Sequence, residues 1–200
     1  MLRDQALATS GLLVEKVGGP SVKPYQPDGI WDVAMGRPKY DTDDGEGLYR
    51  RSLYTFWKRS VPPPAMTIFD AADKNYCTVR RQSTSTPLQA LALLNDPQIA
   101  EAARFIGQRM LSEGGKTTNT RVAWAFRRVT GRKPTDRELD VLTYLYREQH
   151  DLFVADPGAI EEILGVGVKP NRTRHDRAEL AAGTVLGIAL FNHDNAIMRR

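Results

Sequence analysis

The stretch TPLQALALLNDP, residues 86–97, decides the fold that the sequence predicts. Thr86 and Gln89 stand three residues apart around a proline, which is the pattern of a capping box with proline at the first helical position. The helix that starts here is expected to end at Asn95, because the Asp-Pro pair that follows is itself a helix start signal. Two start signals this close together predict helices joined by short connections.

Similar signals recur toward the C-terminus. Thr135 and Glu138 form a second capping box, a further Asp-Pro pair precedes a short apolar segment, and Asp176 is a cap-like start. All these signals together predict helices over residues 87–94, 97–112, 120–130, 135–151, 157–164 and 176–191. In the last helix Gly183 and Gly187 belong to a stripe of small residues, which favours close packing against another helix. The C-terminal part therefore predicts an all-helical array.

The N-terminal part predicts more loop than helix. Residues 3–16 are expected to form one helix, which the glycines and proline of residues 18–20 end. The many prolines and glycines of residues 21–47 predict a long ordered loop. Residues 48–60 carry aromatic side chains at helical spacing and predict a helix, with a strand as the alternative. Residues 65–85, which follow three consecutive prolines, are expected to be irregular, with one short strand allowed around residues 77–79.

These patterns predict a mainly α fold: a helical array with a long ordered Pro/Gly-rich loop region near the N-terminus. Residues 1–200 are expected to form a single domain, in which the loop-rich residues 1–85 pack on the helical residues 86–200. Met1 stands where a helix is already under way, without an N-cap residue before it. We therefore expect the C-terminal fragment of a longer chain, with a true cytoplasmic start as the alternative.

Composition excludes several classes of protein. Of the 200 residues, 41% are apolar and 26% are charged, as in an ordinary globular protein. One cysteine and three scattered histidines exclude a disulfide framework, a four-cysteine zinc site and a CxxCH haem attachment, so we expect no metal and no cofactor in this chain. No apolar run reaches the roughly 20 residues that a membrane helix needs. The net charge of +4 permits an acidic partner without requiring one.

The best candidate site is a basic-aromatic cluster. Seven basic residues lie in it, namely Arg50, Arg51, Lys58, Arg59, Lys74, Arg80 and Arg81, interleaved with Tyr49, Tyr54, Phe56, Trp57 and Tyr76. Arginine forks bind carboxylate, sulfate or phosphate groups, and aromatic faces stack on bases or sugar rings. The predicted ligand-binding residues are Arg50, Arg51, Trp57, Arg59, Arg80 and Arg81. The alternative places the aromatic rings in the core, while the arginines pair with the domain's own acids or cap helix ends.

Other motifs indicate less chemistry. Cys77 has no histidine near it in the sequence and is expected to be a buried small side chain, with a nucleophile or a partner for a cysteine elsewhere as alternatives. The acidic residues 41–46 do not have EF-hand spacing and are expected to form a solvated loop. The GKT sequence at residues 115–117 lacks the rest of a phosphate-binding loop. The pair His193-Asp194 could orient a catalytic group, but a surface position is favoured.

Four stretches together resemble a known family. They are residues 10–27 with SGLL and GGPSVKPYQP, residues 50–59 with RRSLYTFWKR, residues 77–97 with CTVRRQ, TPLQAL and LNDP, and residues 130–139 with TGRKPT and EL. The chain resembles the C-terminal planctomycete-specific domain of unknown function. The resemblance implies a part of a large exported protein that often carries a cytochrome-c-like domain, so that any haem would lie elsewhere in the parent protein. It implies no activity and no catalytic residues.

We therefore expect a non-catalytic interaction or structural module of an exported multidomain bacterial protein, in the periplasm or on the cell surface. Its partners would be other domains of the parent chain and an anionic ligand or an acidic protein surface. One alternative is an enzyme domain acting on anionic glycans, with Asp70 or Asp73 as the acid or base. The other is nucleic-acid binding, which is not favoured because no recognised motif is present. The chain shows no signal peptide.

Overall fold

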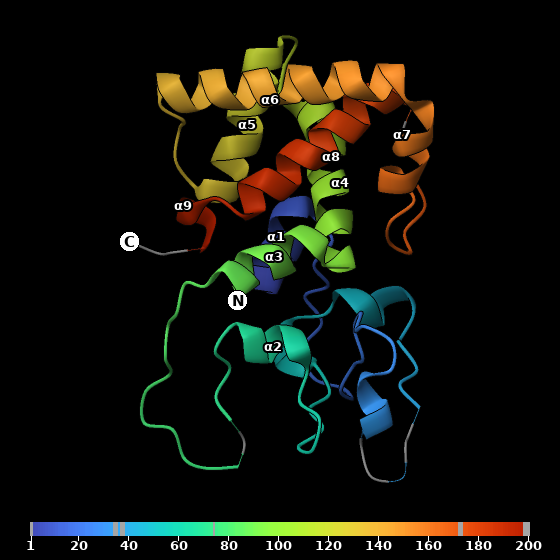
Figure 1. Cartoon of the computed structure of the whole chain (residues 1–200), viewed down its shortest axis with the longest axis vertical. Coiled ribbons are helices and arrows are strands. Elements are labelled where there is room, and N and C mark those ends of the chain that lie inside the picture. The colour runs from blue at the N-terminus through green and yellow to red at the C-terminus, as the bar shows by residue number, and fades with distance from the viewer. Residues whose placement is uncertain (1, 34–35, 37–38, 74, 172–173, 198–200) are drawn as a thin grey trace. The chain divides into compact units, whose positions relative to one another are not determined.

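The computed structural model describes residues 2–33, 36, 39–73, 75–171 and 174–197. The described residues are mainly α-helical, as predicted. The chain divides into two compact units (Figure 1). The helical unit consists of Met1–Leu12 and Leu93–Arg200, and the loop unit consists of Leu13–Ala92. The expectation of a single domain, with residues 1–85 packed on residues 86–200, stays a prediction.

The helical unit is built around its penultimate helix. Its helices are α1 (Leu2–Ser10), α4 (Pro97–Glu113), α5 (Thr118–Thr130), α6 (Asp136–Ala155), α7 (Pro157–Leu164), α8 (Arg177–Phe191) and α9 (Asp194–Ile197). Helix α8 contacts α4, α5, α6, α7 and α9, and Figure 1 shows it between α6 and α4. The core side chains with no exposed surface include Ile106, Met110, Val122, Phe126, Leu180, Leu186 and Leu190.

Glycines let α8 approach α4 closely, as the stripe of small residues predicted. A Cβ on Gly183 would stand 3.2 Å from the Cα of Gly107, and a Cβ on Gly187 would stand 2.9 Å from the carbonyl oxygen of Ala103. A side chain at Gly187 would force the backbone of α4 to move, and one at Gly183 would need its neighbours to shift by a few tenths of an ångström. The backbones of the two helices therefore pack directly against each other at the centre of the unit.

Local capping fixes where most helices begin. The capping box of Thr135 and Glu138 is present at the start of α6, and Asp176 accepts a backbone hydrogen bond at the start of α8. A capping box of Thr117 and Thr120, missed in the sequence, starts α5 two residues earlier than expected. Helix α6 runs to Ala155 rather than residue 151, and α9 was not predicted.

The loop unit contains short helical turns joined by extended segments. They are three 3₁₀ turns, η1 (Ile30–Val33), η2 (Gly45–Tyr49) and η3 (Ser52–Tyr54), and the helix α2 (Pro64–Ile68). Helix α3 (Pro87–Asn95) lies where the loop unit ends and the helical unit resumes. The predicted helix over residues 48–60 is wrong. The carbonyls of Tyr49 and Tyr54 accept hydrogen bonds from Val14 and Val22, so that they pair with distant extended chain instead of closing helical turns.

One further expectation about the loop-rich part is wrong, and a second is right only after Ile68. The first helix ends at Ser10 instead of residue 16, because Gly11 adopts a positive φ of 83° and Leu12 donates back to the carbonyl of Leu7. Residues 65–85, expected to be irregular, begin with helix α2, which has a proline at its first position. In the part of the chain that the structure describes, no helix is long and apolar enough to cross a membrane.

Candidate functional site

Three aromatic rings of the loop unit meet two lysine side chains. The centroid of the Trp31 ring lies 5.0 Å from that of Tyr40 and 5.8 Å from that of Phe56. The ammonium nitrogen of Lys58 lies 4.7 Å from the Trp31 centroid, and that of Lys23 lies 5.8 Å from it. We call these five residues the Trp31 cluster. Trp31 itself is only 7% exposed, so the cluster is a packed feature of the unit.

Backbone pairing fixes the position of Lys23. The neighbouring Val22 donates to the carbonyl of Tyr54 at 2.8 Å and accepts from the N–H of Phe56 at 2.7 Å. Lys23 donates its own N–H to a carboxylate oxygen of Asp43 at 2.8 Å and accepts from the N–H of Asp43 at 2.9 Å. Every backbone polar group on either side of the lysine Cα is thus bound, which holds the side chain beside the rings.

A turn and a buried valine fix the position of Lys58. Val61 donates its N–H to the carbonyl of Lys58 at 3.1 Å and is buried with Trp31 in a small apolar cluster. Tyr40 is held from the other side, because its hydroxyl donates to the carbonyl of Pro24 at 2.6 Å. The turn therefore delivers Lys58 to the same indole ring that Lys23 reaches from a segment 35 residues earlier.

The two ammonium groups have no counter-ion within the described residues. Neither forms an ion pair or donates a hydrogen bond to a protein atom there, and their contacts are with the rings of Trp31 and Tyr40. A cation over an aromatic ring gains about 0.5–1 kcal/mol at an exposed site, but its charge is not neutralised. The cluster thus presents two positive charges, each half-buried, beside one indole ring.

Arg50 plays a structural part among the predicted ligand-binding residues. It is 5% exposed, and its guanidinium donates to the carbonyl oxygens of Lys16, Gly18 and Pro20. Its guanidinium carbon also lies 3.9 Å from the centroid of the Tyr54 ring. These contacts tie residues 16–20 to the centre of the loop unit. The Arg50 side chain is therefore enclosed. The exposed basic surface of the loop unit consists of other basic residues.

Arg81 and Asp70 close the base of an exposed loop. Arg81 donates to the carbonyls of Phe69 and Asp70 at 3.1 and 2.9 Å, at the end of α2. Asp70, at a positive φ of 57°, accepts from both the N–H and the hydroxyl of Thr84 at 2.8 Å. These bonds from Thr84 hold the pKa of Asp70 below its usual value. The nearly buried Gln89 donates to the hydroxyl of Thr84 at 2.9 Å and completes the closure.

The remaining predicted site residues are spread over the unit. Arg51, Arg59 and Arg80 are exposed, and Trp57 is half-buried. Arg59 donates to the side chain of Asn75 at 2.7 Å, which brings it to the exposed loop that follows Asp70. Lys74 lies outside the described residues. Arg51, Arg59 and Arg80 thus contribute exposed basic side chains to the loop unit, and the grouping of the predicted residues into one site stays a prediction.

The other motifs of the loop unit take structural or solvent-facing positions. Cys77 is exposed, so the expectation of a buried side chain is wrong; it stands in a loop with little around it. Asp73 accepts a hydrogen bond from the N–H of Asn75 at 2.9 Å. In the acidic residues 41–46, Asp43 holds the backbone of Lys23. Among the described residues, no three His, Cys, Asp or Glu side chains group to hold a metal ion.

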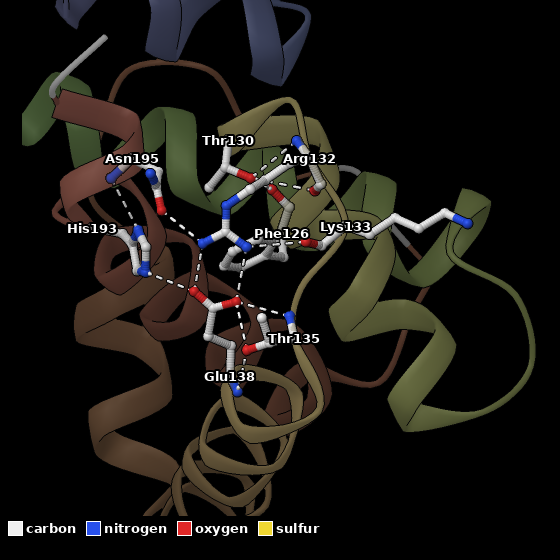
Figure 2. A network of polar contacts seen from close by, with 8 residues as sticks. All are labelled: Phe126, Thr130, Arg132, Lys133, Thr135, Glu138, His193 and Asn195. Carbon is white, nitrogen blue, oxygen red and sulfur yellow. Dashed lines mark hydrogen bonds and ion pairs between the residues drawn. The ribbon is translucent and has the colours of Figure 1, made fainter. Parts of the chain in front are cut away.

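A polar network centred on Arg132 joins the two ends of the α5–α6 connection to the C-terminal turn of the helical unit (Figure 2). Its guanidinium contacts both carboxylate oxygens of Glu138, at 2.5 and 2.8 Å, and donates to the side-chain oxygen of Asn195 at 2.7 Å. Thr135 donates its N–H and hydroxyl to the same carboxylate at 2.8 and 2.9 Å. Hydrogen bonding from Arg132 and Thr135 lowers the pKa of Glu138 to about 2.

His193 belongs to this network. Its Nδ1 accepts from the N–H of Asn195 at 3.1 Å, its Nε2 lies 3.7 Å from Glu138, and its ring stands edge-on to Phe126 with centroids 5.5 Å apart. The sequence paired His193 with Asp194, whereas the contacts found here are with Glu138, Asn195 and Phe126. With Glu138 already held by Arg132 and Thr135, the arrangement is a structural clamp on α9.

Replacing Glu138 with glutamine is expected to lower the free energy of unfolding by about 1–2 kcal/mol at pH 7, because the bidentate ion pair with Arg132 loses its negative charge and one acceptor oxygen, whereas glutamine can still serve the capping box. The folded carboxyl has a pKa of about 2 against an ordinary 4.5, so its contribution is full above about pH 4.5 and disappears as the pH falls toward 2. Urea denaturation at pH 7, 4 and 2.5 measures this difference. The control is Glu148→Gln on the exposed side of α6; a Glu138→Gln effect that is constant with pH would contradict the prediction.

Sequence reasoning missed two sets of residues. Lys23 lies outside the basic-aromatic cluster, and only the folded chain brings it to Lys58. Glu101 and Arg104 are 0% and 1% exposed, and they bind the backbone N–H and carbonyl of Lys169 at 2.8 and 2.6 Å. A guanidinium nitrogen of Arg104 lies 3.7 Å from a carboxylate oxygen of Glu101. No local sequence pattern reveals this buried pair, because charged residues in a helix are expected on its polar, solvent-facing side.

Comparison with known protein families identifies a relationship. A family model described as PSD1, protein of unknown function (DUF1553), matches residues 1–146 of the chain. The matched segment covers the loop unit and the helical unit as far as the middle of α6. Searches of the curated proteins and of the solved structures returned no match.

Proposed function

Since the chain belongs to the PSD1 family of proteins of unknown function, we propose that it is a non-catalytic interaction or structural module of an exported multidomain protein. In this proposal the exposed basic and aromatic residues of the loop unit bind an anionic ligand or an acidic protein surface. Any haem would belong to another domain of the parent protein. The proposal starts from where the cationic side chains lie and from what they bind.

The observation that carries the proposal is that several exposed cations of the loop unit form no ion pair within the described residues. Four arginines of the helical unit, Arg109, Arg121, Arg132 and Arg177, form ion pairs with glutamates of that unit. In the loop unit, Arg51, Arg59 and Arg80 form none among the described residues, and Lys23 and Lys58 only contact rings. Exposed cations without an internal counter-ion favour an anionic partner from outside.

The carboxylates of this region support binding over catalysis. Asp70 accepts two hydrogen bonds from Thr84, and the lowered pKa keeps it ionised at neutral pH. Asp73 accepts a backbone hydrogen bond from Asn75. A general acid at neutral pH needs the opposite shift of its pKa, and a general base needs a carboxylate open toward the substrate. The positive surface thus offers recognition without a matching acid–base pair.

Reversing three exposed charges tests the proposal. The variant Arg51→Glu/Arg59→Glu/Arg80→Glu is expected to bind dextran sulfate or poly-L-glutamate at least tenfold more weakly than the wild type, because a local positive field becomes negative. Binding is measured at low and high salt, with neutral dextran as the uncharged probe. The two anionic probes distinguish an anionic polysaccharide from an acidic protein surface.

A matched control variant has the same net charge as the test variant, but its three substitutions lie in the helical unit. Arg127, Arg137 and Arg147 are exposed arginines of α5 and α6 without an ion pair among the described residues. Their triple replacement by glutamate should alter binding less than threefold. Equal losses in both triple variants, or no binding to either anionic probe by the wild type, would refute the proposed function. Single-stranded DNA that binds more tightly than both probes, with a steep salt dependence, would point instead to nucleic acid.

A further inference from the structure

We propose that Lys23 and Lys58 form a binding site for one compact oxyanion, a carboxylate, sulfate or phosphate group, and that Phe56 offers a face to the ring that carries it. The inference rests on the proposed function and deepens it, because it assigns the anion to a particular pair of side chains. The exposed arginines would attract the ligand, and the lysine pair would hold its charged group.

The backbone that carries the two lysines is held in place. The backbone of Lys23 is bound on both sides, to Asp43 directly and to residues 54–56 through Val22. Lys58 belongs to a turn whose Val61 is buried against Trp31. Side chains that start from fixed backbone lose less conformational entropy when they bind, which is a property of a preorganised site.

The positive charges of the two lysines are not neutralised by the described residues. Both ammonium nitrogens lie within 6 Å of the centroid of one indole ring, and the described residues supply neither with a carboxylate. Both charges are partly withdrawn from water, and the ring neutralises neither. A bound oxyanion supplies the missing negative charge and accepts the ammonium N–H groups in charge-assisted hydrogen bonds.

The lysines and Phe56 together define the chemistry of the ligand. Lysine presents a compact ammonium with three donors, which suits an oxyanion as a point charge, whereas arginine favours planar bidentate pairing. Phe56 is 36% exposed and packs at 5.8 Å from Trp31, so part of its ring faces solvent beside the cations. A sugar ring that carries a carboxylate or phosphate would place its apolar face there and its charge on the lysines.

Small probes test this site directly. Glucuronate and glucose 6-phosphate are titrated into the protein, with glucose as the neutral probe and inorganic phosphate as the probe without a ring. The indole N–H resonance of Trp31 is followed by NMR. Lys23→Met and Lys58→Met keep the aliphatic stem on the ring and remove the charge, and each is expected to weaken the binding of the charged sugars at least fivefold. The double variant is expected to abolish it. Phe56→Ala should weaken binding of the charged sugars and leave that of inorganic phosphate within twofold.

Two further variants keep the result interpretable. Lys23→Arg and Lys58→Arg retain the charge, so each should bind within threefold of the wild type if the methionine effects come from charge rather than from misfolding. Thermal unfolding of every variant is measured beside the titrations. Binding that is unchanged in the double methionine variant, or a glucose response equal to that of glucuronate, would overturn the inference.

The outcomes separate this inference from the proposed function. If the polymers bind through Arg51, Arg59 and Arg80 while no small anion shifts the Trp31 resonance, the lysine site is refuted and the basic surface stands. If neither polymers nor small anions bind, both are refuted. If glucose 6-phosphate and inorganic phosphate bind but glucuronate does not, the site selects phosphate over carboxylate, which supports the oxyanion site and narrows its ligand.

Discussion

Replacing Arg104 with methionine is expected to lower the free energy of unfolding by about 3–5 kcal/mol, because the substitution leaves a buried carboxylate beside an uncharged side chain. Glu101 and Arg104 are almost completely buried in α4, and both bind the backbone of Lys169. Gly167, at a positive φ of 95°, lies directly on the Glu101 side chain. The buried pair therefore anchors residues 167–169 of the connection between α7 and α8.

A double variant distinguishes a paired charge from mere packing. Glu101→Leu/Arg104→Met removes both charges, so it is expected to be less destabilised than the Arg104→Met single variant, although two hydrogen bonds to Lys169 are lost. Urea denaturation of the wild type, both single variants and the double variant gives the coupling energy. Simple addition of the two single effects would show that the charges do not depend on each other.

Replacing Gly187 with valine is expected to cost about 3 kcal/mol of unfolding free energy, through forced separation of α4 and α8. Even the first carbon of the new side chain would stand 2.9 Å from the carbonyl oxygen of Ala103 and 3.0 Å from its Cα. These are backbone atoms in the middle of a helix, and they cannot turn aside as a flexible side chain would. Alanine at this position should already destabilise, although alanine favours helices over glycine by about 1 kcal/mol.

The control for this variant is Glu148→Val, which places the same side chain on an exposed position of α6. It should cost less than about 1 kcal/mol, because only helix propensity changes there. Thermal and urea unfolding compare the two. A Gly187→Val variant as stable as the control would mean that the two helices can separate at little cost, contrary to the close contact in the structure.

The features that could be predicted from the sequence are those set by neighbours along the chain. Thr135 and Glu138 are three residues apart, and their capping box depends on nothing else. The aromatic spacing of residues 48–60 also suggested a helix, but the hydrogen bonds of Tyr49 and Tyr54 are taken by Val14 and Val22. Such partners lie more than 30 residues away, and no local pattern reveals them.

The candidate site also has features that the sequence predicts and features that depend on distant parts of the chain. Clustering of basic residues along the sequence was enough to locate Arg51, Arg59 and Arg80 on the exposed surface of the loop unit. It could not show that Arg50 turns inward to three carbonyl groups, because that depends on where residues 16–20 pass. Nor could it pair Lys23 with Lys58, whose meeting at Trp31 follows from the pairing of Val22 with residues 54–56.

The closure at Asp70, Thr84 and Arg81 has a practical consequence for studying the molecule. The loop that it closes carries the sole cysteine of the sequence, Cys77, with its thiol open to solvent. A maleimide dye can therefore be attached at one defined place in this chain of 200 residues, without removing other thiols. Because the bonds at the base of the loop do not involve Cys77, the label would report on events at the basic surface from a position that leaves the closure intact.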